Sequence, residues 1–454
     1  MTSWFQHRLR RLHPTNLLLF SFLATIAVGT LLLMLPAAAG SGRLAFIDAL
    51  FTATSAVCVT GLIVVDTGSY FSAFGQGVIL FLIQIGGLGI MTISVALFQI
   101  IGKKVVFQQR MAMQEVFSAA PRADIYAILR SVIVFTVIIE TVGALALFLH
   151  WQGAYPAGEA AKLAVFHAVS AFCNAGFSLF TDSLVGFRAS GIVNATVGSL
   201  IVLGGIGFPV VYEIYRHATG SDKGRVSIQT KAVLAASAAL VGLGALVILV
   251  SEKTTVASMG IGERLLTAFF QSVTCRTAGF NTIDIASFNT ATLLFMMFLM
   301  LVGASPGSCG GGIKTTTLVV LGGFSWSRLM RRKCVNLFGK TLPGETVTKS
   351  VSVLVFSLAT IGVAVFVILF ADPEHGARIG GNRQFLSYLF ETVSAFATVG
   401  LSMGATGVLT PVGKLTIIVL MIIGRVGVPA FTYIIAGAAS TKGIQYAEEN
   451  LMIG

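Results

Sequence analysis

The sequence predicts an all-α membrane protein in which eight transmembrane helices form four similar units around one axis. Three observations support this fold class: the composition, the two lengths of the apolar runs, and a loop motif that occurs four times. The chain is 55% hydrophobic and only 11% charged, whereas soluble domains carry about 25% charged residues. Lipid solvates apolar side chains, so this composition is typical of a chain embedded in a bilayer.

The long apolar runs account for the transmembrane helices, because most of them reach the roughly 20 residues that a spanning helix needs. They cover residues 15–36, 75–101, 127–151, 190–216, 230–252, 287–329, 347–371 and 412–437. A shorter apolar segment lies between the two members of each pair, and its length predicts a pore helix that enters the membrane without crossing it. These segments are Phe46–Val57, Glu159–Phe172, Gly262–Thr274 and Phe385–Phe396.

The repeat is clearest where each short segment runs into a glycine. The endings read FTATSAVCVTGL, FHAVSAFCNAGF, FFQSVTCRTAGF and FETVSAFATVGL, with a phenylalanine ten residues before each glycine: Phe51, Phe166, Phe269 and Phe390. A fixed period of this kind decides an architecture more firmly than a single motif. The predicted units are 1–118, 119–226, 227–340 with a broken second helix, and 341–454 with a C-terminal tail.

The basic residues predict the orientation. If the four loops face one side, the connectors on the other side carry 19 of the 30 Lys and Arg residues and the loop-side connectors carry eight. The positive-inside rule then places both termini in the cytoplasm and the four loops outside. The same distribution argues against nucleic acid as the partner of this chain, despite its net charge of +12.

The four loops predict a cation filter. Non-helical backbone inside a bilayer is tolerated only where protein buries it or where it lines a water-filled path. Helices that enter from outside direct their negative dipole ends inward, which favours a cation, and rings of carbonyls replace the hydration shell of K⁺ in channels. The alternative is that the glycines only allow close helix packing. The candidate filter loops, whose carbonyls are expected to hold K⁺, are Cys58, Val59, Thr60, Gly61; Cys173, Asn174, Ala175, Gly176; Arg276, Thr277, Ala278, Gly279; and Ala397, Thr398, Val399, Gly400.

Arg276 carries the one charge in these loops. A cation that points into a cation path would repel the substrate, so we expect a structural role behind the filter. The expected partner is Glu391 on a neighbouring short helix.

A glycine-rich loop interrupts the second long helix of the third unit. It consists of Gly303, Ala304, Ser305, Pro306, Gly307, Ser308, Cys309, Gly310, Gly311 and Gly312. Proline removes a backbone donor and glycine is a poor helix former, so the loop predicts a flexible barrier below the filter. A nucleotide-binding phosphate loop is the alternative, but Ile313 separates Gly312 from Lys314, whereas that motif needs adjacent Gly and Lys.

Two further cations lie in apolar surroundings. Arg425 interrupts an apolar run, and such residues usually face a cavity or a partner; it forms either a buried ion pair or part of the barrier. Lys314 is either a similar barrier or extends its flexible stem to the cytoplasmic surface.

The chain resembles the Trk/Ktr/HKT superfamily of potassium transporters, most closely its KtrB membrane subunits. The stretches that carry the resemblance are SAVCVTGL, SAFCNAGF, TCRTAGFNTID, SAFATVGLS, GASPGSCGGGIKTTT at 303–317 and IIGRVGVP at 422–429, spread over essentially the whole chain. The resemblance implies a K⁺-channel-like fold and K⁺ uptake across the bacterial inner membrane. It also implies that the glycine-rich loop is the gate, with Arg425 facing the pore beside it.

The resemblance further implies partners. It predicts a homodimer in membrane lipid on a cytosolic regulatory ring of RCK/KTN type that binds ATP or ADP, with Na⁺ as a candidate activator and no resident cofactor. Candidate docking surfaces are the basic stretches 103–110 and 328–340, and the tail Tyr446–Gly454 is a candidate dimer contact. In sodium-preferring relatives the first loop has serine, so Gly61 favours K⁺.

Other functions remain open from the sequence. A secondary transporter of another solute also uses broken helices, although its repeats are usually inverted or few, and a Na⁺-selective relative is a second alternative. A membrane enzyme is not supported, because no His/Glu/Asp cluster has metal or catalytic spacing and His167 lies on a short helix without an evident partner.

Overall fold

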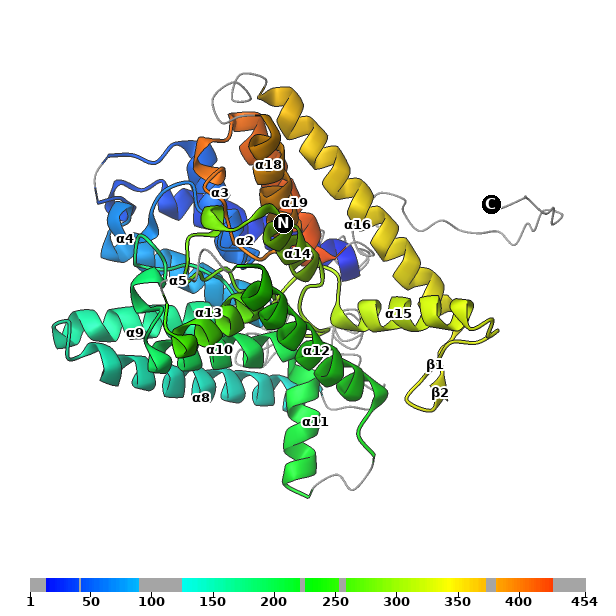
Figure 1. Ribbon diagram of the computed structural model, residues 1–454. Coiled ribbons are helices and arrows are strands. Elements are labelled where there is room, and N and C mark those ends of the chain that lie inside the picture. The colour runs from blue at the N-terminus through cyan, green and yellow to red at the C-terminus, as the bar shows by residue number, and fades with distance from the viewer. Residues whose placement is uncertain are drawn as a thin grey trace, which may run out of the picture.

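The computed structural model describes residues 14–40, 42–89, 125–220, 225–252, 259–372 and 381–427. Nearly all regular structure in these ranges is helical, which confirms the all-α prediction (Figure 1). The one sheet among the described residues is a hairpin of β1 (Asn336–Leu337) and β2 (Lys340–Thr341), which was not predicted.

The helices follow the predicted order of long, short and long. The first two groups contain α2 (Pro14–Leu33), η1 (Pro36–Ala38), α3 (Phe46–Val57), α4 (Thr67–Tyr70), α5 (Ala73–Leu88), α8 (Ile125–Trp151), α9 (Ala157–Phe172), η2 (Val185–Phe187), α10 (Gly191–Ile206) and α11 (Phe208–Ala218). The last two contain α12 (Ile228–Ser251), α13 (Ile261–Thr274), η3 (Ile285–Ser287), α14 (Thr290–Leu301), α15 (Thr315–Leu329), α16 (Gly344–Ala371), α18 (Gly381–Phe396), η4 (Thr406–Val408) and α19 (Pro411–Val426).

Within the described residues, three helices are long and apolar enough to cross a membrane. These are α8, α12 and α16, and the bent pair of α10 and α11 makes a fourth if it counts as one span. Large apolar side chains such as Phe366 and Phe370 of α16 are 67% and 80% exposed. Soluble monomers rarely expose large contiguous apolar patches, so these outer faces contact lipid and the chain is a membrane protein.

Not all eight predicted spans are recovered at full length. Helices α5 and α19 have 16 residues each, and each ends at a glycine with positive φ, Gly89 at 80° and Gly427 at 92°. The predicted continuations to residues 101 and 437 lie outside the described residues.

The predicted helix 190–216 is not one straight span. It bends by 98° between α10 and α11, where Gly207 has φ +97° and Pro209 follows. The glycine-rich loop bonds the backbone groups that the bend frees: Ser305 N–H donates to Gly205 O at 3.1 Å, and Phe208 N–H donates to Gly307 O at 3.0 Å. A loop distant in sequence therefore stabilises the bend, which the apolar run at 190–216 does not reveal.

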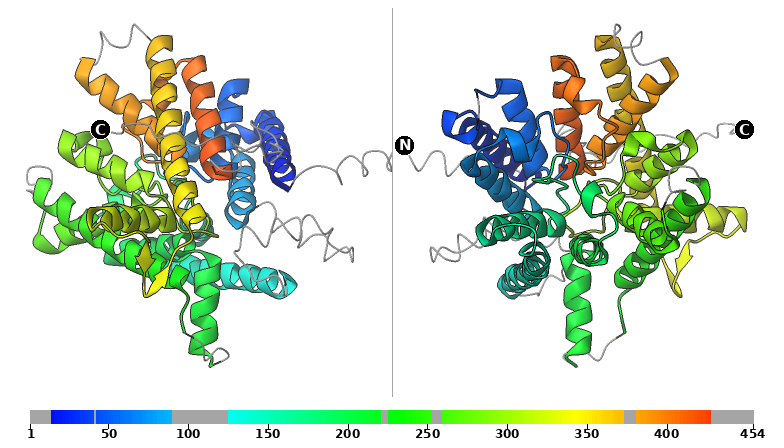
Figure 2. Two further views of the ribbon diagram at one scale, coloured as in Figure 1. Left: turned by 90° about the vertical axis from the view of Figure 1, so that its right-hand side faces the viewer. Right: turned by 60° about the vertical axis from the view of Figure 1, so that its left-hand side comes forward.

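The helix pairs close into a ring. The second long helix of each group packs against the short helix of the next: α5 on α9, α10 on α13, α14 on α18, and α19 on α3. The last contact joins the last group of helices to the first, and the two groups lie side by side in Figures 1 and 2. All four short helices therefore end near the same central region.

An ion pair at this closure predicts a loss of stability on mutation. Lys414 Nζ of α19 lies 2.6 Å from Asp48 Oδ1, in the first turn of α3, and the two side chains are only 14% and 20% exposed. We expect Lys414→Ala to cost about 1–3 kcal/mol, between the values for exposed and buried pairs, because Asp48 loses its partner. The measurement is the thermal midpoint in detergent.

The matched control is Lys349→Ala, which breaks an exposed pair with Glu345 whose side chains are 74% and 77% exposed. That pair is expected to contribute little to stability, because water screens charges that are this exposed. Equal shifts in the two variants would contradict a special role for the α19–α3 closure.

Candidate functional site

Three of the four short helices end in the same hydrogen-bonded motif. In the first loop Thr60 N–H donates to Ser55 O at 2.8 Å and Val59 N–H donates to Ala56 O at 3.1 Å. This pair of bonds defines the Schellman motif, which stops a helix and satisfies its last carbonyls. In the second loop, Ala175 N–H donates to Ser170 O and Asn174 N–H donates to Ala171 O. In the fourth loop, Val399 N–H donates to Ser394 O and Thr398 N–H donates to Ala395 O.

The residue two before each glycine adopts a left-handed conformation. The φ angles are 57° at Val59, 59° at Asn174, 62° at Thr277 and 50° at Thr398. Such angles are unusual for β-branched residues such as Val59, Thr277 and Thr398, and strain of this kind persists only where the surrounding structure holds it, often at functional sites. The four loops therefore share an unusual backbone conformation although the residue at this position differs among them.

The four glycines meet in a closed ring. A Cβ added to Gly61 would lie 2.4 Å from Ala175 O, one on Gly176 would lie 2.7 Å from Ala278 O, one on Gly279 would lie 2.6 Å from Val399 O, and one on Gly400 would lie 2.1 Å from Thr60 O. Each loop thus touches the carbonyl of the next loop, and the fourth touches the first. Positive φ at all four glycines, from 70° to 91°, adds a second reason for glycine here.

The third loop is one residue shorter than the others. Its equivalent bond runs from Ala278 N–H to Thr274 O at 3.0 Å, spanning four residues instead of five. The buried phenylalanine of α13 is consequently Phe270, which is 1% exposed, whereas Phe269 is 48% exposed. In this unit the phenylalanine ten residues before the glycine is therefore not the buried one, because the chain is one residue shorter between the helix and the glycine.

Arg276 lies in this shortened loop and is 8% exposed. Its predicted pairing with Glu391 is wrong. The Glu391 carboxylate accepts bonds from Ser402 Oγ at 2.6 Å, Thr406 Oγ1 at 2.6 Å and two backbone N–H groups of the same loop. Its oxygens are already used within its own unit, while Arg276 Nε is buried without a hydrogen-bond partner among the described residues.

The glycine-rich loop lies directly against two of the candidate filter loops. Gly311 N–H donates to Thr398 Oγ1 at 3.0 Å, and a Cβ added to Gly310 would lie 2.0 Å from Thr277 Oγ1. The loop closes on itself through Ala304 N–H and Gly311 O at 3.3 Å. Glycine at 310 and 311 is therefore required by the close approach of the loop to Thr277 and Thr398.

Arg425 and Lys314 both bond this loop. Arg425 of α19 donates to the carbonyl oxygen of Cys309 in the glycine-rich loop and to that of Gly86 in α5. It therefore links α19, the loop and α5. Lys314 Nζ donates to Gly310 O at 2.8 Å, so its ammonium lies in the loop and does not extend to the surface. Among the described residues, Arg425 donates to carbonyl oxygens and pairs with no carboxylate.

A second glycine position, missed in the sequence, supports the site. In three units, a Cβ added to a glycine of the second long helix would meet the carbonyl of the last residue of a short helix. The distances are 2.1 Å from Gly86 to Val57 O, 1.8 Å from Gly204 to Phe172 O and 1.8 Å from Gly424 to Phe396 O. The signal was present as Gly-x-x-Gly at 86–89, 204–207 and 424–427. These glycines let the second long helices of the first, second and fourth units approach the base of the loop.

His167 has partners, contrary to expectation. Its ring nitrogens lie 2.8 Å from Leu163 O and 3.0 Å from Ser178 Oγ. No group of three or more metal-binding side chains occurs in the part of the chain that the structure describes.

Comparison with known proteins decides the family. The profile of TrkH, described as a cation transport protein, matches residues 3–442. The chain belongs to the TrkH/Ktr family. This TrkH/Ktr chain is 38% identical to the Ktr system potassium uptake protein B of Vibrio alginolyticus, over 97% of this chain and 94% of that protein. It is 36% identical to the potassium/sodium uptake protein NtpJ of Enterococcus hirae, over 98% of each chain.

A solved structure supports the fold of this TrkH/Ktr chain. The potassium transporter TrkH from Vibrio parahaemolyticus superposes with a TM-score of 0.73 at 19% identity, covering 94% of this chain and 85% of that one. At this identity the likeness concerns the fold alone.

Proposed function

We propose that this chain is the K⁺-conducting subunit of an uptake system, with the four candidate filter loops as its selectivity filter. The observation that carries the proposal is the closed ring of glycines and preceding carbonyls at Thr60, Ala175, Ala278 and Val399. Four carbonyls around one axis replace the hydration shell of a monovalent cation. The names of the relatives, which are potassium uptake proteins, support K⁺ as the substrate.

The glycine-rich loop is the proposed gate. It lies against Thr277 and Thr398 of the candidate filter loops and is held in place by Arg425. A guanidinium and the Lys314 ammonium beside the path repel cations. Opening the path then requires the loop to leave its bonds to Thr398, Arg425 and the end of α10.

One observation favours a second candidate. NtpJ of Enterococcus hirae is named a potassium/sodium uptake protein, so a filter that also passes Na⁺ is the alternative reading. Glycine at all four filter positions is the reason to prefer K⁺, as the family resemblance implies.

The proposed assembly has the four loops outside, both termini in the cytoplasm, and a homodimer on a cytosolic nucleotide-binding ring. The term "Ktr system" in the names of two relatives supports a multi-subunit system. The proposed docking surface within the described chain is the end of α15 and the β1–β2 hairpin, where Arg331 and Arg332 are exposed. The other predicted docking stretch, 103–110, and the tail Tyr446–Gly454 lie outside the described residues.

Rubidium uptake into proteoliposomes tests the proposal. Liposomes that contain the purified chain should take up rubidium when an outward K⁺ gradient drives the uptake. External K⁺ should compete with rubidium, and Na⁺ should compete at least about tenfold more weakly, which corresponds to about 1.4 kcal/mol of selectivity. Equal competition by Na⁺ would favour the second candidate. Absence of rubidium uptake by folded protein, together with uptake of an organic solute, would contradict the conducting role.

A further inference from the structure

A polar side chain occupies the same position on all four short helices. It lies nine residues before the loop glycine in the first, second and fourth units, and eight residues before it in the shortened third unit. The four residues are Thr52, His167, Gln271 and Glu391, and each is at most 2% exposed. Burying a polar group costs free energy unless it forms hydrogen bonds, so the partners of these side chains define the role of the position.

Three of these side chains bond a hydroxyl group of the chain that follows the loop glycine. The hydroxyl belongs to the second residue after the glycine in the second and fourth units, and to the third residue after it in the third unit. These hydrogen bonds, which we call the anchor bonds, join His167 to Ser178 at 3.0 Å, Gln271 to Thr282 at 3.4 Å and Glu391 to Ser402 at 2.6 Å. Each anchor bond therefore connects the chain that leaves a candidate filter loop to the helix that enters the same loop.

The direction of the anchor bond at His167 follows from the second partner of its ring. Nδ1 lies 2.8 Å from Leu163 O, and because a carbonyl oxygen only accepts, Nδ1 carries the proton. In the neutral imidazole Nε2 is then the acceptor, and Ser178 Oγ donates to it. The Ser178 oxygen in turn accepts the Phe180 N–H at 3.0 Å, so the imidazole holds a turn of the chain beyond the loop.

The fourth unit repeats this arrangement. Ser402 Oγ donates to the Glu391 carboxylate and accepts the Gly404 N–H at 2.8 Å. The same carboxylate also accepts the N–H groups of Met403 and Ala405. The serine therefore closes a turn and bonds the short helix at the same time, as Ser178 does in the second unit.

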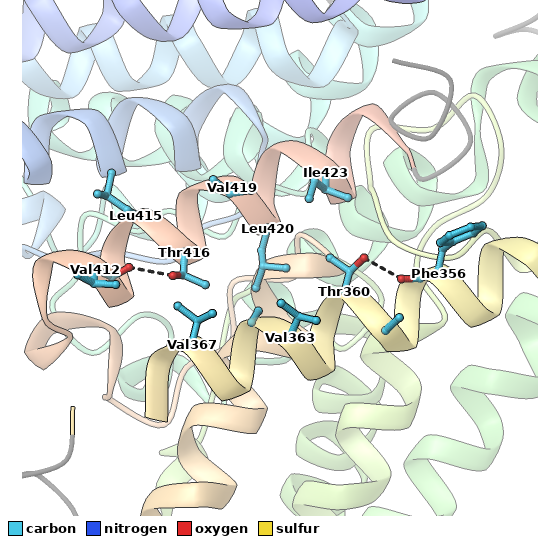
Figure 3. Close-up of a pocket in the computed structure, with 12 residues that line it drawn as sticks. Phe356, Thr360, Val363, Val367, Val412, Leu415, Thr416, Val419, Leu420 and Ile423 are labelled. Atoms are coloured by element: carbon cyan, nitrogen blue, oxygen red, sulfur yellow. Dashed lines mark hydrogen bonds between the residues drawn. The ribbon is translucent and has the colours of Figure 1, made fainter. Parts of the chain in front are cut away.

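The long helices of the fourth unit supply no such bond across the groove between α16 and α19. Of the side chains that line this groove, two are polar, Thr360 and Thr416. Each hydroxyl donates within its own helix, at 2.7 Å to Phe356 O and at 2.9 Å to Val412 O (Figure 3). Apolar contacts are non-directional, so the directional bonds to the chain beyond the fourth loop come from the short helix.

The first unit differs from the other three at this position. Thr52 Oγ1 donates to Asp48 O of its own helix at 2.8 Å. The second residue after Gly61 is Ile63, which has no hydroxyl group. Thr52 therefore makes no anchor bond in the described structure, and it provides a control within the same chain.

We infer that the three anchor bonds set the ion selectivity of the candidate filter loops, with His167, Gln271 and Glu391 as positioning residues. The inference rests on the proposed filter function. Carbonyls discriminate between ions through their number and placement, and placement requires that the chain on both sides of the glycine is held. Backbone bonds to the end of the short helix hold the chain before each glycine, and the anchor bonds hold the chain after it. A loop released on that side adapts to ions of different size.

Competition for rubidium uptake into proteoliposomes tests the inference. The readout is the ratio of the Na⁺ and K⁺ concentrations that halve rubidium uptake, which a partial loss of folded protein does not change. Ser178→Ala removes the donor to His167 and should lower this ratio about fivefold, which corresponds to about 1 kcal/mol, the size of one neutral hydrogen bond. Ser178→Thr keeps the hydroxyl and Thr52→Val removes one that makes no anchor bond, so both should keep the parent ratio.

A double variant separates the anchor bond from the turn that Ser178 closes. His167→Leu should lower the ratio as much as Ser178→Ala does. The combination of the two should lower it no further, because both changes remove the same bond. Ser402→Ala tests the anchor bond of the fourth unit independently and should also lower the ratio, and thermal midpoints in detergent confirm that the variants fold.

Two results would overturn the inference while leaving the proposed filter in place. One is rubidium uptake by the parent with an unchanged ratio in folded Ser178→Ala and Ser402→Ala proteins. The other is an additive loss in the double variant, since Ser178 would then act through its own turn. Absence of rubidium uptake by the folded parent would contradict the proposed function and this inference together.

Discussion

Replacing Gly400 with alanine is expected to abolish cation flux while the chain still folds. The new Cβ would lie 2.1 Å from Thr60 O, and the backbone at φ +89° adds about 1–2 kcal/mol of strain for an L-residue. The first loop must shift to relieve the contact, which opens the ring at the point where its two ends meet. We expect rubidium uptake to fall by at least about 100-fold, since each 1.4 kcal/mol added to a barrier slows it tenfold.

Gly404 provides the matched control. It also has positive φ, +88°, but a Cβ there meets no atom within 4 Å. Gly404→Ala therefore carries the backbone strain without the clash, and its flux should stay within about threefold of the parent, less than 1 kcal/mol. Comparable loss of flux in the two variants would show that strain in the loop matters, and not the closed ring.

Removing the glycine-rich loop is expected to raise cation uptake. Deletion of 305–312 removes the segment that lies against Thr277 and Thr398. Arg425→Ala should do so more weakly, because it removes the bonds to Cys309 O and Gly86 O but leaves the loop in place. Hydrogen bonds from a charged donor contribute about 1.5–3 kcal/mol, so the Arg425 variant should gain about tenfold in rubidium uptake.

The control for charge is Arg328→Ala on α15, measured on the purified chain without a cytosolic partner; its guanidinium lies over the Phe324 ring at 5.2 Å. It should leave uptake unchanged. Unchanged or lost uptake in well-folded Δ305–312 and Arg425→Ala proteins would contradict the gate assignment.

The sequence predicted the short helices well because their signals are local. Phe46–Val57 was predicted and observed with the same bounds, and the other three short helices end at the predicted residue. Each ends where backbone bonds between nearby residues stop it. The glycine-rich break was equally local, since Pro306 and five glycines cannot form a regular helix.

The errors concern contacts between distant segments. The bend at Gly207 depends on bonds from residues 305–309, about 100 residues later, and no helical periodicity at 190–216 reveals it. Glu391 was assigned to Arg276 because opposite charges in a membrane sequence suggest an ion pair. In the structure, hydroxyl and N–H groups of the loop that follows Glu391 bond its carboxylate instead. Lys314 could be placed only once the loop carbonyl of Gly310 was located.

The central claim, that cations pass through the ring of Thr60, Ala175, Ala278 and Val399 carbonyls, is tested most directly by anomalous scattering from crystals grown in rubidium. The account predicts a peak on the axis of the four loops, enclosed by these carbonyls, that is lost in Gly400→Ala crystals. Rubidium peaks confined to other parts of the protein, with flux preserved, would contradict it.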